Sequence, residues 1–232
     1  EIVHGAAGAY GGTTHGPVIR LFTKRDAASL VPSDDAVEDP TARTHLRYST
    51  VDKATIAHIE AQQDSENYSF LFSGTSRDFG DLRAGGEFSF QRPTAYEEST
   101  GHTRLQYFMT DRRTLDLDIQ IAEQTNVPQF DRLMSGSHIA YRLTPRKREQ
   151  CRISYLDTVA RSWSQRLAAS VSLNQQRQKA YQQTALEPEE AVQSSDNNDS
   201  ESFLLRVESA LGEHHSLTWG LERVEEKIGA VR

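Results

Sequence analysis

From Arg43 onward, apolar residues recur at every second position in a series of separate runs. The clearest run is TLDLDIQIAEQ, in which leucine and isoleucine at positions 115, 117, 119 and 121 alternate with aspartate and glutamine. Successive side chains of a β-strand point to opposite faces, so this run predicts a strand with one apolar face and one acidic or amide face. No stretch of the sequence has the period of a convincing helix.

The same alternation predicts about nine strands joined by connections of two kinds. The strands are expected at residues 43–51, 54–63, 66–77, 102–110, 114–124, 149–158, 165–176, 201–211 and 214–224. Tight turns are expected at 64–66, 111–113, 160–164 and 212–213, and long polar connections at 78–101, 125–148 and 177–200. In an up-and-down sheet this order places every turn at one end and every long loop at the other.

The separation of turns from loops predicts an all-β fold, specifically a portion of an antiparallel up-and-down transmembrane β-barrel with about nine strands. Outer-membrane barrels combine strands of about 10 residues with short periplasmic turns and longer extracellular loops. A soluble β-sandwich is the alternative, but it does not usually sort its loops by length so consistently. In a barrel, the stripe from Leu115 to Ile121 would face lipid.

Composition narrows the range of functions. The chain has 232 residues, enough for one or two domains, and its net charge of −7 argues against a nucleic-acid partner. Its single cysteine, Cys151, supplies neither a disulfide framework nor a metal-binding pair. No run approaches the roughly 20 apolar residues of a transmembrane helix.

Motifs for catalysis are absent from the sequence. It contains no nucleophile elbow, P-loop, HExxH motif or paired carboxylates in apolar surroundings, so we expect no enzyme, no cofactor and no metal site. The segment EPEEAVQSSDNNDS, residues 187–200, lacks the spacing of an EF-hand loop and is expected to be a solvated acidic loop. His214 and His215 are adjacent, so on a strand they would point to opposite faces.

The glycine-rich opening, EIVHGAAGAYGGTTHGPVIRLFTKR, resembles the end of the plug domain of TonB-dependent outer-membrane receptors. The positions that match the family pattern are Val3, Gly5, Tyr10, Gly11, Gly16, Val18, Thr23 and Lys24. The departures are His4 in place of arginine, Ala6 in place of proline, Pro17 in place of glycine and Arg20 in place of asparagine. A plug that folds tightly inside a barrel needs glycine where backbone passes close to backbone.

A second resemblance lies in the remaining sequence. SRDFGDLRAGG (residues 76–86) and RPTAYEE (92–98) resemble the first long extracellular loop of some of these receptors, and VPQFDRL (127–133) resembles another loop motif. The resemblance implies that residues 1–33 are the C-terminal part of the plug, 34–42 a linker and 43–232 the N-terminal part of the barrel. It also implies a fragment, because the family barrel has about 22 strands.

The function implied by this resemblance is active import across the outer membrane of a Gram-negative bacterium. The usual ligands of the family are ferric siderophores, haem and cobalamins, with oligosaccharides in some branches, and an iron-siderophore or haem is favoured. The partners would be the TonB complex, reached through the missing N-terminal part, and outer-membrane lipid. Ligand contacts are expected at Tyr10, Thr13, Thr14, His15, Phe79, Arg83 and Tyr96. For His15 a hydrogen-bonded role inside the plug is favoured over a haem ligand.

Two other functions are weighed against this one. The alternative is a soluble β-rich ligand-binding or adhesion domain without transport, which would stay monomeric without detergent, whereas a lipid-facing stripe would aggregate. A passive porin is disfavoured by the plug motif.

Overall fold

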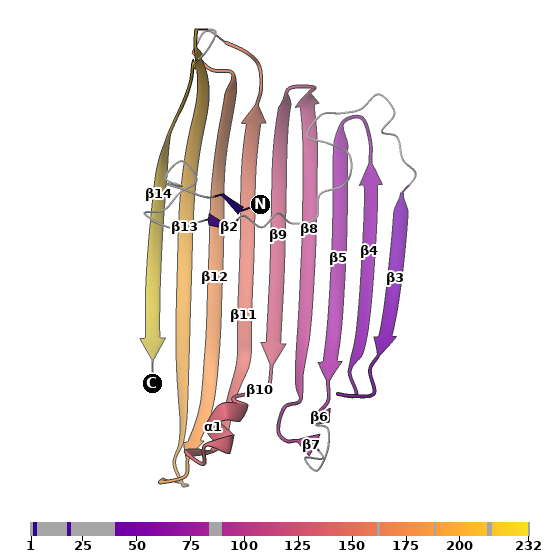
Figure 1. The fold of residues 1–232 in the computed structure, drawn as a ribbon, viewed down its shortest axis with the longest axis vertical. Helices are drawn as coiled ribbons and strands as arrows, with labels where there is room; N and C mark the ends of the chain where they lie inside the picture. The colour runs from indigo at the N-terminus through magenta and orange to yellow at the C-terminus, as the bar shows by residue number, and fades with distance from the viewer. Residues whose placement is uncertain are drawn as a thin grey trace.

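Nine long strands form one antiparallel sheet, in which each pairs with the next long strand along the chain (Figure 1). The computed structural model describes residues 2–3, 18–19, 40–83, 90–161, 163–187, 189–212 and 215–231. The long strands are β3 (Thr41–Tyr48), β4 (Thr55–Asp64), β5 (Tyr68–Phe79), β8 (Tyr96–Thr110), β9 (Arg113–Thr125), β11 (His138–Asp157), β12 (Arg166–Thr184), β13 (Ala191–Leu211) and β14 (His215–Val231). The predicted all-β, up-and-down arrangement is confirmed.

Several short elements accompany the sheet. Strands β6 (Leu82–Arg83) and β7 (Phe90–Gln91) pair with each other, and β10 (Val127–Pro128) pairs with β11. Strands β1 (Ile2–Val3) and β2 (Val18–Ile19), which flank most of the glycine-rich run, also pair. One helix of five residues, α1 (Phe130–Met134), was not predicted. Among the residues with a described structure, no helix is long and apolar enough to cross a membrane.

Connections of different kinds lie at the two ends of the sheet, as predicted (Figure 1). The turns after β4, β8, β11 and β13 lie at one end, hereafter the turn end, and the connections after β3, β5, β9 and β12 lie at the other, the loop end. The predicted sorting by length is wrong between β11 and β13: the β11–β12 turn covers residues 158–165, whereas the β12–β13 connection, predicted to be long, covers only 185–190.

The strands extend much further toward the loop end than the sequence pattern indicated. Strand β11 begins at His138 rather than near residue 149, and β13 begins at Ala191 rather than near 201. The expectation of a solvated loop over residues 187–200 is therefore wrong, since residues 191–200 pair with β12 from Gln183↔Ala191 to Asn174↔Ser200. Backbone pairing continues where both faces are polar, and there the apolar alternation that reveals a strand is lost.

The two faces of the sheet differ in polarity, and the apolar face is the exposed one. Directly opposed residues of antiparallel strands share a face, so the strand registers assign every side chain to one face or the other. Large exposed side chains of the apolar face are Leu46, Ile59, Phe72, Leu105, Tyr107, Ile121, Ile153, Val171, Leu173, Trp219 and Leu221. Buried side chains of the polar face include Asp64, Ser69, Arg104, Gln106, Thr114 and Asp118. This polarity is the reverse of that expected for a sheet packed on a water-soluble core.

Strand β14 closely approaches β13 at Gly220. A Cβ at this position would overlap the carbonyl oxygen of Leu205 and lie 3.3 Å from Cα of Arg206, whereas a Cβ at Gly229 of the same strand would have no atom within 4 Å. We predict that Gly220→Ala lowers the free energy of unfolding by about 1–3 kcal/mol, because backbone must move to admit the methyl group.

The matched control for this prediction is Gly229→Ala. For both variants, the midpoint of urea unfolding in detergent micelles is measured from the fluorescence of the neighbouring Trp219. Equal midpoints for the two variants would contradict the close approach at Gly220.

Candidate functional site

The polar face carries a ladder of paired charges across β8 and β9. The Arg104 guanidinium donates to Asp116 Oδ2, with Nε at 3.0 Å, and the Gln106 amide donates to the same oxygen at 2.9 Å. His102 Nε2 lies 3.0 Å from Asp118 Oδ2, and the Gln120 amide donates to Asp118 Oδ1 at 2.9 Å. Because each carboxylate has cationic or amide partners, this ladder satisfies polar groups that the sheet buries.

A second cluster lies on the same face nearer the loop end. The guanidinium of Arg77 donates to the carboxylate of Glu98, which also accepts from the Gln124 amide at 2.7 Å. The next opposed pair, Phe79 and Tyr96, has stacked rings with centroids 4.6 Å apart. This stack lies at the mouth of the polar face, where β5 ends and β8 begins.

Strand β11 places three exposed arginines on the polar face, and none of them has a carboxylate partner among the described residues. Arg146, Arg148 and Arg152 are opposed on β9 by Gln124, Ala122 and Asp118. Arg148 donates to Gln150 at 3.3 Å, and no ion pair of these three arginines occurs within the described part of the chain. We call this set the inner arginine stripe; it differs from Arg104 and Arg77, whose charges are compensated.

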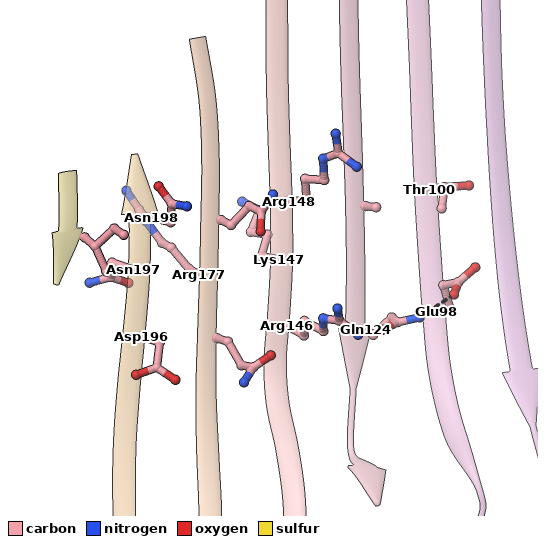
Figure 2. Close-up of a pocket in the computed structure, with 14 residues that line it drawn as sticks. Glu98, Thr100, Gln124, Arg146, Lys147, Arg148, Arg177, Asp196, Asn197 and Asn198 are labelled. Carbon is pink, nitrogen blue, oxygen red and sulfur yellow. Dashed lines mark hydrogen bonds between the residues drawn. The ribbon is translucent and has the colours of Figure 1, made fainter. Parts of the chain in front are cut away.

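Two adjoining hollows follow the inner arginine stripe along the polar face. The first, of about 510 Å³, lies toward the loop end and has Glu98, Arg146, Arg148, Asp196 and Asn198 in its lining (Figure 2). The second, of about 530 Å³, shares Arg148 and continues past Arg152 toward the paired ladder. The arginine charges therefore face an open polar groove that could hold an anionic molecule.

Three residues that border the first hollow belong to the opposite face by register. Lys147, Arg177 and Asn197 each lie between two residues of the polar face along the chain, so alternation points their side chains away from it. The hollow is thus a feature of the polar face, and its floor is sheet backbone.

The sequence-predicted site residues are only partly brought together. Phe79 and Tyr96 stack, whereas Arg83 lies in β6, where its backbone N–H donates to the carbonyl of Val51 at 2.9 Å. The other predicted residues, Tyr10, Thr13, Thr14 and His15, lie outside the described residues. A ligand-binding role for all seven stays a prediction.

The inner arginine stripe was missed because a long connection is predicted over residues 125–148, which separates Arg146 and Arg148 from Arg152 in the predicted strand. A signal was present in RKREQCR, where Arg146, Arg148, Gln150 and Arg152 alternate with residues of the other face. In the described ranges, no group of three or more His, Cys, Asp or Glu side chains could together hold a metal ion.

Comparison with known proteins gives a fold but no sequence relative. No family model and no curated protein matches the chain. The solved structure of the copper transporter OprC superposes with a TM-score of 0.70 at 11% identity, covering 86% of this chain and 30% of OprC. A mutant of the ferric enterobactin receptor PfeA from Pseudomonas aeruginosa, in complex with enterobactin, gives a TM-score of 0.49 at 11% identity, covering 82% of this chain and 31% of the receptor.

The chain thus spans about a third of the length of the solved structures that it matches. At this identity the likeness to OprC concerns the fold alone. Together with the exposed apolar face and the up-and-down order of strands, it identifies the fold of the sheet as a portion of an antiparallel β-barrel wall.

The paired ladder yields a prediction about stability. Asp116→Ala removes the acceptor of both Arg104, which is 8% exposed, and Gln106, so a buried charge loses its partner. We expect a loss of about 3 kcal/mol in the free energy of unfolding, measured by urea titration in detergent micelles.

Glu149→Ala is the matched control, because its partner Lys147 and Glu149 itself each retain 34% side-chain exposure. Its cost should stay below about 1 kcal/mol. If Asp116→Ala cost no more than Glu149→Ala, the polar face would not be the crowded interior side of the sheet.

Proposed function

We propose that this sheet is part of the barrel of an outer-membrane receptor that imports a scarce nutrient with TonB-coupled energy. The observation that carries the proposal is the inverted polarity of the sheet: large apolar side chains such as Leu105, Ile121 and Leu173 are exposed, while Arg104 and Asp118 are buried. Lipid is the solvent that favours such an outer face, and a polar lumen favours the other. The fold shared with OprC supports transport as the activity.

In a membrane, the two edges of the sheet need further strands to pair with. Strands β3 and β14 each pair with only one neighbour among the described strands. Unpaired backbone groups have no partners in lipid, so a membrane-spanning sheet must close on itself. We propose that further strands of a longer protein complete the barrel, with residues 1–33 as the end of its plug, 34–42 as a linker and 43–232 as the start of the barrel.

The ligand that we propose is an anionic iron-siderophore or haem, entering from the loop end. The inner arginine stripe supports an anionic ligand, since uncompensated guanidinium groups bind carboxylate and similar oxygen anions through paired hydrogen bonds. The stacked rings of Phe79 and Tyr96 offer an apolar contact to a flat ligand near the same entrance. The resemblance of the glycine-rich opening, residues 1–25, to the end of a plug domain supports coupling to TonB.

The inner arginine stripe provides the test of this function. The variant Arg146→Gln/Arg148→Gln/Arg152→Gln is expressed in cells as the full-length receptor. Its affinity for the anionic chelate should fall at least about tenfold for each arginine that binds the ligand, because a hydrogen bond to a charged group contributes about 1.5–3 kcal/mol. Binding and uptake of radiolabelled ferric catecholates, ferric hydroxamates and haem are measured, with and without TonB.

One of these ligands should show TonB-dependent uptake that falls in the variant. Arg112→Gln, at the exposed turn between β8 and β9, is the control and should leave uptake unchanged. Absence of uptake for every ligand, or uptake that does not need TonB, would contradict the proposed function.

A further inference from the structure

A second basic surface lies on the other face of β11 and β12, beyond the apolar stretch of these strands. The registers oppose Lys147 to Arg177 and Arg142 to Tyr181, and they place Lys179 on the same face between these two rows. All are on the face that carries Val171 and Leu173, because alternate residues of β12 share a face. Four cationic side chains thus gather within two neighbouring strands.

Three of these cations have no carboxylate partner among the residues that the structure describes. Lys147 is paired with Glu149, Nζ to Oε1 at 2.8 Å, but no ion pair of Arg142, Arg177 or Lys179 occurs in the part of the chain that the structure describes. All three are exposed. The residues of β13 opposite this surface are neutral: Gln193, Ser195 and Asn197. We call Arg142, Arg177 and Lys179 the outer basic patch.

The geometry of the outer basic patch suits an anionic group. Arg142 stacks on the ring of Tyr181, with the guanidinium carbon 5.0 Å from the ring centroid, and Arg177 donates to Gln175 at 3.2 Å. A hollow of about 370 Å³ is lined by Arg142, Lys179 and Tyr181 together. Like charges opposed across strands destabilise a sheet, so Lys147 beside Arg177 is a cost that an anionic partner would offset.

The position of the outer basic patch indicates that the anionic partner is a lipid. Leu173 is the last aliphatic residue of the outer face of β12, and Arg177 follows it by four residues, or about 13 Å of strand toward the loop end. In the proposed membrane placement, the headgroup layer borders the hydrocarbon region near this height, and long basic side chains reach back toward it. The inner arginine stripe lies on the opposite face of β11, so the two basic surfaces cannot share one ligand.

We propose that the outer basic patch binds the phosphate groups of a phosphorylated lipid in the membrane leaflet at the loop end. The two guanidinium groups provide paired hydrogen bonds to phosphate oxygens, and Lys179 adds a third positive charge. The inference rests on the proposed membrane placement of the sheet, and it is independent of which nutrient the lumen binds.

The test is lipid binding by the full-length protein in detergent micelles. Native mass spectrometry measures the binding of bis-phosphorylated lipid A and of the same lipid without its phosphates. The variant Arg142→Gln/Arg177→Gln/Lys179→Gln should bind the phosphorylated lipid about 100-fold more weakly, since each basic side chain near an anionic surface contributes about fivefold. Binding of the dephosphorylated lipid should not change.

Two controls separate this proposal from the proposed function. Arg142→Lys/Arg177→Lys keeps the charges and should retain most lipid binding, which excludes a folding defect as the cause. The triple glutamine variant of the inner arginine stripe removes as many charges from the other face and should bind the lipid normally. Equal lipid binding by the wild type and the outer variant, or no preference for phosphorylated lipid, would overturn the proposal even if chelate uptake were normal.

Discussion

The rest of the structure depends on one constraint, namely that the apolar face of the sheet must be the outer one. A face that exposes Leu105, Ile121 and Leu173 is stable only against an apolar surrounding, because removing such side chains from water is the main favourable term in burial. The polar face must then satisfy its own charges, and the pairing of Arg104 with Asp116 and of His102 with Asp118 does so. Lipid outside and a polar lumen inside meet both demands.

The same constraint fixes the strand register. A slip of one residue between β9 and β11 would turn Asp116 and Asp118 outward and Leu115 and Leu117 inward, which would place carboxylates against an apolar surrounding. Toward the loop end the constraint is relaxed, since both faces of β11, β12 and β13 become polar there. That freedom allows arginines on both faces of β11: one set toward the lumen and the other set outward.

Much of the fold was predictable because alternation persists wherever the sheet has one apolar face. All nine long strands were located, since runs such as Leu115 to Ile121 keep a period of two. The full extents of β11 and β13 were missed, because Arg146 to Gln150 and Gln193 to Ser200 carry polar residues on both faces, although Ile139, Tyr141 and Leu143 near the start of β11 do alternate. Helix α1 has only five residues, which is too short to show a helical period.

The candidate site was less predictable than the fold. The proximity of Phe79 and Tyr96 follows from the resemblance of their segments to one loop, and the structure stacks their rings. The inner arginine stripe was lost with the misassigned start of β11. The strand register is irregular between Leu143 and Arg146, and this irregularity decides on which face of the sheet Arg146 lies. Local sequence does not specify that register.

The central claim, that alternate residues of one strand face lipid and lumen, can be measured directly along β9. Cys151→Ser removes the single native cysteine, and nitroxide labels are then attached one at a time at positions 115 to 121 of the protein in a bilayer. The account predicts that collisions with oxygen, which is concentrated in lipid, are high at 115, 117, 119 and 121 and low at 116, 118 and 120. Uniform access of a water-soluble nickel chelate to all seven positions would contradict it.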